Sequence, residues 1–303
     1  MKHKEKPISD DEIRVIGSDN IGSGKRKTWL IVIIAAALLA ISGLVWWLSG
    51  NEGHPKPEVP KNNVVEHSLV EPDNIAQTQP DIKAPLSKSG DLGRAYVEIA
   101  DTIINDIPMR VYIPHEVSYS LHLGKIDRND KDIIFTAQAA DIRADNGGIV
   151  GAYVLKGEPK AWGLSKQGYC AIINDTVTIG VSDNSPLFEK ATEQGGYFFR
   201  QFPLVGDGKL VESEQRGKSF RRALCERAGE LFTVETLTPE SFHDFSQALV
   251  DLGVDQAVYL VGGAAYGWAV DANGKRHEFG DPSPKRNSHK WRNINYLVMR
   301  EKK

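Results

Sequence analysis

The sequence has few cysteines and little net charge, and it lacks the common nucleotide-binding motifs. Of its 303 residues, 37 are Lys or Arg and 40 are Asp or Glu, which gives a formal net charge of -3. A dedicated nucleic-acid-binding protein needs a strongly basic surface, so this balance argues against a nucleic-acid partner. No G-x-x-x-x-G-K-[ST] or G-x-G-x-x-G stretch follows an expected strand. We therefore expect no nucleotide cofactor.

Only two cysteines occur, Cys170 and Cys225, and no cysteine or histidine spacing indicates zinc. Asp141, Asp145 and Asn146 lie close in sequence but lack EF-hand spacing, so we expect no metal site there. Both cysteines lie in apolar, strand-like runs. Two alternatives therefore stay open. Either the cysteines form a disulfide, which an oxidising compartment permits, or both are buried thiols.

A long uncharged segment lies near the N-terminus. Residues 28–48, TWLIVIIAAALLAISGLVWWL, would span roughly 31 Å as a helix, about one hydrocarbon core. Basic residues at 25–27 precede the segment, and tryptophans lie near both of its ends. This pattern predicts a single transmembrane signal anchor, with residues 1–27 as a cytoplasmic tail and the C-terminal part extracytoplasmic, in the periplasm or at the cell surface. A cleaved signal peptide is the alternative.

The segment after this anchor differs in composition from the rest of the chain. Residues 51–90 contain six prolines and no aromatic residue, so they cannot bury enough surface to offset the entropy of ordering. We therefore predict a proline-rich linker over 49–90 and a folded domain over 91–303.

Alternating apolar residues and turn signals indicate a sheet-rich domain with few helices. Two hairpins are predicted around Asn105-Asp106 and Ala228-Gly229. The chain supplies further expected strands and one short helix at 187–194. The expected strands are 97–104, 108–114, 132–138, 148–155, 169–173, 176–181, 197–205, 221–227, 230–236 and 255–261.

A second helix is predicted between the last two of these strands. Thr238 would be its N-cap, Pro239 its first residue, and Gly253 would end it. A helix between two strands implies a right-handed parallel crossover. The predicted fold class is therefore α+β: a mixed, mostly antiparallel sheet with few helices and one strand–helix–strand crossover.

Three short motifs in the second half of the domain occur in a familiar order. They are FPLV (202–205), RRAL (221–224) and, after the strand–helix–strand unit, LVGG (260–263). This series resembles the phosphodiester glycosidase family, which includes the N-acetylglucosamine-1-phosphodiester alpha-N-acetylglucosaminidases. The resemblance extends over roughly residues 130–300. It implies a protein that acts on, or binds, a sugar phosphodiester or another anionic glycan.

The resemblance also implies roles for particular residues. Arg221 matches the family arginine, whose guanidinium would suit a phosphate. Gly262 and Gly263 match the glycine pair that lets the backbone approach a ligand. Val261 occupies the position at which the family has aspartate. Arg222 should point to the opposite sheet face, where we expect it to be exposed to solvent.

Valine cannot act as nucleophile, acid or base in glycosyl transfer, so hydrolysis would need another carboxylate. Asp141 and Asp145 are the catalytic candidates, and Asp271 is a further one, although D-N-G-G at 145–148 is also a strong turn signal. Tyr266 and Trp268 alternate beyond the glycines and would either stack on a sugar ring or pack in the core. Two functions stay open: a sugar-phosphodiester hydrolase, or a glycan-binding or envelope scaffold protein that has lost the chemistry.

Overall fold

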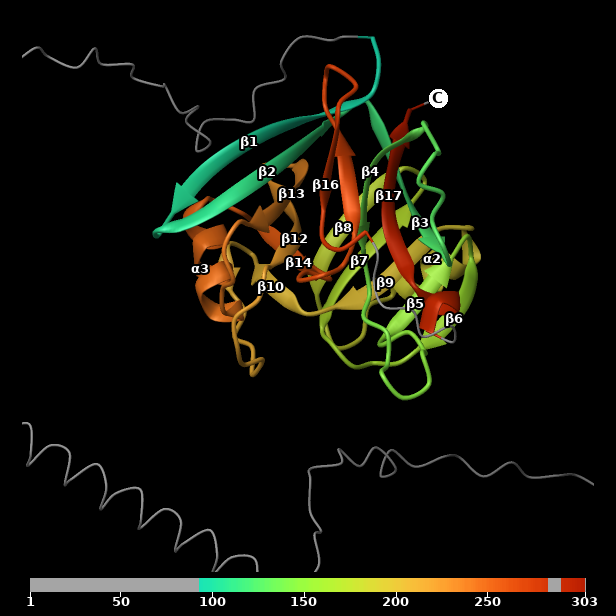
Figure 1. Cartoon of the computed structure of the whole chain (residues 1–303). Coiled ribbons are helices and arrows are strands. Elements are labelled where there is room, and N and C mark those ends of the chain that lie inside the picture. The colour runs from blue at the N-terminus through green and yellow to red at the C-terminus, as the bar shows by residue number, and fades with distance from the viewer. Residues whose placement is uncertain (1–92, 283–289, 303) are drawn as a thin grey trace, which may run out of the picture. The chain divides into compact units, whose positions relative to one another are not determined.

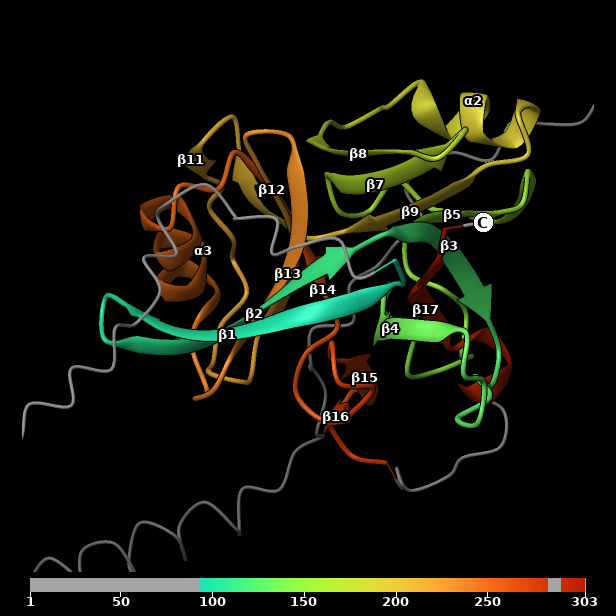
Figure 2. The same cartoon turned by 90° about the horizontal axis from the view of Figure 1, so that it is seen from above.

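The computed structural model of the protein describes residues 93–282 and 290–302. About half of these residues form strands, which are arranged in three sheets (Figures 1 and 2). The first sheet has seven strands, in the order β1 (Tyr96–Ile104), β2 (Ile107–His115), β13 (Glu230–Thr236), β12 (Arg222–Arg227), β14 (Gln256–Leu260), β10 (Pro203–Gly206) and β11 (Lys209–Leu210).

The other two sheets have five strands each. The second sheet has the order β16 (Arg276–Phe279), β15 (Gly267–Val270), β4 (Ile133–Gln138), β17 (Asn295–Glu301) and β3 (Val117–Leu123). The third sheet has the order β6 (Glu158–Trp162), β5 (Ala152–Leu155), β9 (Tyr197–Gln201), β7 (Gly168–Ile173) and β8 (Thr176–Val181). The helices of the described residues are α2 (Leu187–Glu193), α3 (Phe242–Asp251) and the short 3-10 helix η2 (Lys290–Asn293).

The predicted α+β class with a mixed sheet is wrong. Every strand pairing in the described part of the chain is antiparallel, and α2 and α3 are short. The helix α3 does connect two strands of like direction, because β13 and β14 both pair antiparallel with β12. However, β12 is the hairpin partner of β13 and lies between them, so the two parallel strands share no hydrogen bonds. The domain is therefore predominantly antiparallel β.

The predicted membrane anchor at 28–48 lies outside the described residues, as do the tail and the linker. Among residues 93–282 and 290–302, no helix is both long and apolar enough to cross a bilayer.

Both predicted hairpins form. The first contains β1 and β2, with Asn105 and Asp106 at positive φ values of 51° and 62° in the turn. The predicted strand over 197–205 is split, because Phe202 separates β9 in the third sheet from β10 in the first. This one segment therefore connects two sheets.

The helix α3 begins three residues later than predicted, with Ser241 as its N-cap. The Ser241 side chain accepts a hydrogen bond from the Asp244 amide at 3.0 Å. The residue before it, Glu240, is held in an extended bridge with Ser219 by two backbone hydrogen bonds. Because this bridge fixes the chain before Ser241, Thr238 cannot serve as the cap.

The three sheets share one apolar core. It contains Phe135 from the second sheet, Tyr153 and Phe199 from the third, and Leu224 and Leu260 from the first, and all five are fully buried. On its other face, the first sheet is covered by the apolar side of α3. Strand ends from all three sheets consequently meet around the shared core, and the polar residues described next lie there.

Candidate functional site

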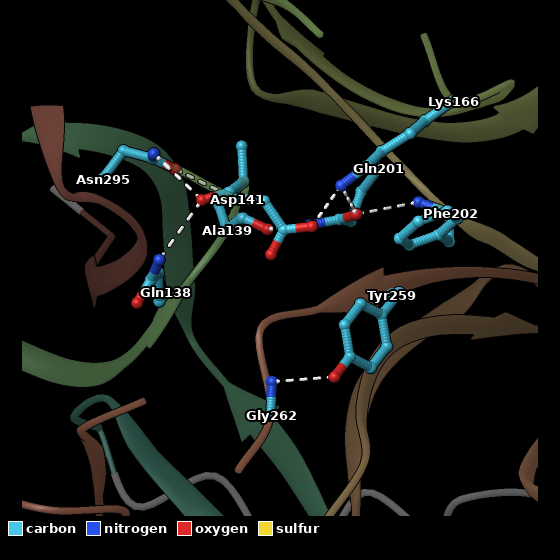
Figure 3. Close-up of polar contacts among 10 residues, drawn as sticks. Gln138, Ala139, Asp141, Lys166, Gln201, Phe202, Tyr259, Gly262 and Asn295 are labelled. Carbon is cyan, nitrogen blue, oxygen red and sulfur yellow. Dashed lines mark hydrogen bonds and ion pairs between the residues drawn. The ribbon is translucent and has the colours of Figure 1, made fainter. Parts of the chain in front are cut away.

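The ends of β4, β9 and β14 meet where the three sheets join (Figure 3). The Val261 amide donates to the Gln138 carbonyl at 2.9 Å, which connects the end of β14 to that of β4. The Gln201 side chain donates to the Ala139 carbonyl at 3.3 Å, which connects β9 to the same segment. Residues that are far apart in sequence therefore surround Asp141, which directly follows this segment.

Three side chains form what we call the polar cluster: Asp141, Lys166 and Gln201. The Lys166 ammonium is paired with the Asp141 carboxylate and donates to Gln201 Oε1 at 2.7 Å. It also lies 4.2 Å from the centre of the Phe202 ring, a cation–π contact. The Lys166 side chain is only 8% exposed, whereas that of Asp141 is 33% exposed. The carboxylate is thus the part of the cluster that solvent reaches most readily.

Burial sets the electrostatics of the cluster. Removal of the Lys166 ammonium from water lowers its pKa, and the neighbouring Asp141 carboxylate offsets this effect only in part. An ammonium has three donors, and two of them are used by Asp141 and Gln201. The arrangement therefore holds a poorly hydrated cation beside a partly exposed anion.

The loop that carries Lys166 is held in an uncommon conformation. Lys166 has a φ of 73°, in the left-handed region that side chains other than glycine rarely adopt. Arg200, which is 2% exposed, donates to the Lys166 carbonyl at 3.0 Å and to the Ser182 carbonyl at 2.8 Å. Backbone strain of this kind costs on the order of 1–3 kcal/mol and persists only where its surroundings fix it. The buried arginine supplies that fixation.

Asn295 positions the chain segment just before Asp141. This fully buried side chain accepts from the Ala140 amide at 2.7 Å and donates to the Ala140 carbonyl at 3.1 Å (Figure 3). The backbone carbonyl of Asn295 accepts a hydrogen bond from the Ala139 amide at 3.1 Å. The segment after β4 is therefore fixed on both sides, by Asn295 and by Gln201.

The glycine pair lies on the other side of the same junction. A Cβ atom on Gly262 would lie 2.1 Å from the Phe220 carbonyl oxygen and 2.9 Å from the Tyr259 hydroxyl. The Gly262 amide donates to that hydroxyl at 3.1 Å, and the Gly263 amide donates to the Phe220 carbonyl at 2.8 Å. Gly262 is thus required because another part of the same chain approaches closely, and Gly263 has a left-handed φ of 59°.

Arg221, the residue just before β12, and Arg222, its first residue, point to opposite faces of the first sheet, as predicted. Arg221 lies on the α3 side, with its guanidinium 4.2 Å from the centre of the Phe242 ring. It donates to the Glu240 carbonyl at 2.8 Å and to the Gly217 carbonyl at 2.7 Å. The Phe242 ring in turn lies 5.3 Å from the Phe202 ring that Lys166 contacts, so two aromatic rings separate the two cations. The Nε and Nη2 donors of Arg221 are already used.

Arg222 is on the face that covers the shared core, and the expectation that it is exposed was wrong. It is 1% exposed and donates through Nε to Glu235 at 2.7 Å. It also donates to the Val261 carbonyl at 2.8 Å and stacks on Phe279. Arg222, rather than Arg221, is thus the arginine that contacts the residue before the glycine pair.

The other predicted carboxylates lie apart from the polar cluster. Asp145 is exposed in the turn, where Arg143 pairs with it at 3.1 Å and the Asn146 amide donates to it at 2.8 Å. These two hydrogen bonds lower the pKa of Asp145. Asp271 pairs with His277 at 2.8 Å and lines a cavity of about 410 Å³ beside β1.

The predicted aromatic pair does not form a free stacking surface. Trp268 is 1% exposed, and the Arg276 guanidinium lies 3.7 Å from its ring centre. The Tyr266 hydroxyl donates to Glu278 at 2.7 Å and accepts from Arg128 at 2.9 Å. Of the two alternatives, core packing describes Trp268.

The sequence reasoning missed Lys166, Gln201, Arg200 and Asn295. One signal was present: the apolar run YFFRQFPLV contains an arginine and a glutamine inside an expected strand. Polar residues in a buried strand need partners, so this pair indicated a polar network. Lys166 and Asn295 gave no comparable signal, because their partners lie 25 to 155 residues away in sequence.

No protein-family model matches the chain, and no curated protein matches it in sequence. Several solved structures are similar to it, among them the following two. The catalytic domain of zebrafish N-acetylglucosamine-1-phosphodiester alpha-N-acetylglucosaminidase, auto-inhibited by its pro-peptide, is 14% identical, with 69% of this chain and 83% of that chain covered and a TM-score of 0.47. A hypothetical protein from Synechocystis is 11% identical, with 67% and 62% covered and a TM-score of 0.52.

The chain therefore spans less than two thirds of the Synechocystis protein. At these identities the likeness is a distant relationship of fold. The class that the fold defines is thus a predominantly antiparallel β domain of three sheets.

Proposed function

We propose that this domain binds a sugar phosphodiester at the polar cluster of Asp141, Lys166 and Gln201. The observation that carries the proposal is a poorly hydrated ammonium beside a carboxylate that is one-third exposed. The third donor of Lys166 would bind a phosphate oxygen, since charge-assisted hydrogen bonds are the strong ones. The outer oxygen of Asp141 would accept from sugar hydroxyls.

The phosphate role moves from Arg221 to Lys166 in this proposal. The Arg221 guanidinium donates to two backbone carbonyls and stacks on Phe242. Binding of a phosphate there would break contacts that fix the start of α3. Lys166 is the cation that Asp141 contacts directly.

We favour binding over hydrolysis because the cluster holds one carboxylate. Glycosidases of the usual kind need two carboxyl groups about 5 to 9.5 Å apart. Val261 replaces the family aspartate, Asp145 is in an exposed turn, and Asp271 pairs with His277. Hydrolysis stays the second candidate, since Asp141 is partly exposed and could exchange protons with a bound substrate.

The test measures binding and turnover together. The purified protein is titrated calorimetrically with a sugar-1-phosphodiester, and release of the phosphomonoester is followed by phosphorus NMR. Lys166→Met should weaken binding about 10- to 150-fold, the equivalent of one charge-assisted hydrogen bond of about 1.5–3 kcal/mol. Asp145→Asn is the matched control and should bind like wild type, because Asp145 belongs to the turn.

Three outcomes separate the functions. Binding without monoester release, weakened in Lys166→Met, supports the binding protein. Release that is abolished by Asp141→Asn supports the hydrolase. Absence of binding to the wild-type protein contradicts both.

A further inference from the structure

The strand β1 is the longest of the strands that form sheet edges in the described part of the chain. It has nine residues, whereas β11, β16, β6, β8 and β3 have two to seven. Among residues 93–282 and 290–302, no strand pairs with the side of β1 that faces away from β2, and Figure 1 shows β1 at the outside of its sheet. An open edge of this length can pair with another strand unless its sequence prevents it.

The β1 sequence has few of the features that prevent edge pairing. It reads YVEIADTII, with no proline and no lysine, and it pairs with β2 over nine consecutive residues without a bulge. The edge strand β6, by contrast, contains Pro159 and has a register shift against β5. Proline, lysine and bulges are common means of blocking an edge. The charged residues of β1 are Glu98 and Asp101, which repel an acidic strand and attract a basic one.

The hairpin turn determines which backbone groups of β1 are available. A turn of two residues joins Ile104 to Ile107, so these two form a hydrogen-bonded pair, and in an antiparallel ladder such pairs alternate with non-hydrogen-bonded ones. The partner of Ile103 agrees with this alternation, because the Pro108 carbonyl accepts from the Leu237 amide at 2.8 Å, away from β1. The residues whose amide and carbonyl groups point to the open edge are therefore Val97, Ile99, Asp101 and Ile103.

The cavity of about 410 Å³ lies against this edge. Its lining includes residues 96–99 in succession and Asp101. One face of a strand contributes only alternate residues, so the consecutive run indicates that the edge of β1 itself forms a wall. The lining also includes residues 271–273 of the turn between β15 and β16, and His277 of β16.

The charges of the cavity favour a basic side chain. Its lining residues include the carboxylates Glu98, Asp101 and Asp271, whereas Arg110 is the one lysine or arginine among them. Arg110 donates to the two Asp101 oxygens at 2.7 and 2.8 Å, and the Asp101 side chain is still 54% exposed. A carboxylate can accept about four hydrogen bonds. Asp101 therefore has room for a second cationic donor.

We propose that the open edge of β1 binds an extended segment of another protein as an added strand, and that the cavity takes a basic side chain of that segment. The inference does not depend on the proposed function, since the polar cluster takes no part in it. A partner residue directly opposite Asp101 would have its Cβ about 4.5–5.5 Å away, on the same face. An apolar partner residue two positions along would cover Ile103, which is 59% exposed. Main-chain hydrogen bonds would give affinity, and the alternate side chains would give specificity.

Two other occupants fit this edge less well. Two copies of β1 paired edge to edge would bring only acidic charged residues together, and like charges on facing strands are destabilising. The predicted linker has six prolines within residues 51–90. Each proline lacks the amide that a paired strand needs.

The experiment titrates the full-length protein with two capped peptides, TVTKTVT and TVTETVT, in a calorimeter. The central residue would lie opposite Asp101 and the valines opposite Ile99 and Ile103. The lysine peptide should bind about 3- to 10-fold more tightly than the glutamate peptide, as expected for a favourable in place of an unfavourable cross-strand charge pair. Asp101→Asn should remove most of this preference. Asp145→Asn, in an exposed turn, is the matched control and should keep it.

A second pair of variants tests the backbone contact. Ile103→Pro removes an amide that points to the open edge and leaves the bonds to β2 in place, so it should weaken the lysine peptide at least about 5-fold. Ile103→Val retains the amide and should bind like wild type. Equal urea midpoints of the two variants would show that the hairpin is intact.

Amide hydrogen exchange gives a readout for each residue. In the free protein, the amides of Ile99, Asp101 and Ile103 should exchange faster than those of Ala100 and Thr102, which bond to β2. The lysine peptide should slow exchange at the first three.

Four results would overturn the inference. If neither peptide binds, the edge does not accept a strand. If both peptides bind equally, the cavity does not select a basic side chain. Slow exchange of the three outward amides in a free monomer would mean that this chain already covers the edge. A wild-type dimer that Ile103→Pro dissociates, measured by sedimentation, would make a second copy the occupant.

Discussion

Substitution of Gly262 by alanine tests the most demanding backbone contact of the site. The added methyl carbon would lie 2.1 Å from the Phe220 carbonyl oxygen, far closer than van der Waals contact allows. The obstacle is a backbone atom of Phe220, two residues before β12, so it cannot turn away as a flexible side chain would. One of the two chain segments must move, and the hydrogen bonds from Gly262 to Tyr259 and from Gly263 to Phe220 would be strained or lost.

The size of the effect follows from these contacts. Overpacking costs about 1–3 kcal/mol, and each lost hydrogen bond adds about 1 kcal/mol. We therefore expect Gly262→Ala to lower the free energy of unfolding by about 3–5 kcal/mol. This is a large share of the total stability of an ordinary domain.

Urea denaturation followed by circular dichroism measures this difference, and Gly206→Ala is the control. A Cβ atom on Gly206 would meet only methyl groups, Val181 Cγ2 at 3.2 Å and Val211 Cγ2 at 3.5 Å, and both can shift. Its cost should stay below about 1 kcal/mol. If the two variants unfold at the same urea concentration, the Phe220 carbonyl does not lie against Gly262, and the reasoning about the glycine pair is refuted.

Three further predictions concern buried or paired groups. Arg222→Met should destabilise the protein by about 3–5 kcal/mol, because it leaves Glu235 without its buried partner; the added change Glu235→Gln should restore part of that loss in the same urea assay. The hydrogen bond from His277 lowers the pKa of Asp271 below 3.8, so its stabilisation is present above that pH and lost as the pH falls through the lowered pKa. Asp271→Asn should therefore reduce the fall in melting temperature below pH 3.8, and an unchanged acid profile would contradict this. Both cysteines are buried free thiols whose pKa values burial raises, so a thiol reagent should react with two groups only after unfolding, whereas no reaction without reductant would reveal a disulfide.

The ten predicted strands and both hairpins form because they depend on neighbours in sequence. Six strands were not predicted, and four of them, β3, β15, β16 and β17, belong to the second sheet. Alternating apolar residues indicated β1 and β2, and the Asn105-Asp106 turn requires the positive φ values that these residue types tolerate. The start of α3 was misplaced because a contact with Ser219, more than twenty residues before Ser241, decides where the helix begins.

The candidate site was predictable only in part. Asp141 was identified as a carboxylate candidate, and the structure places it in the polar cluster. Asp145 and Trp268 were selected by the same kind of reasoning, yet one lies in an exposed turn and the other in the core. A single sequence does not distinguish these three environments, because each is created by the strands that pack around the residue.

The sequence by itself determined part of the local conformation of this protein: ten segments that form strands, the turns of two hairpins, and that Arg221 and Arg222 point to opposite faces. Side-chain alternation along a strand requires this last feature whatever surrounds it. Only the tertiary structure decided that Arg222 is buried on Glu235 and that Lys166 meets Asp141 and Gln201. The physical reason is that burial and ion pairing depend on which strands become neighbours, and the packing of three sheets sets those neighbours.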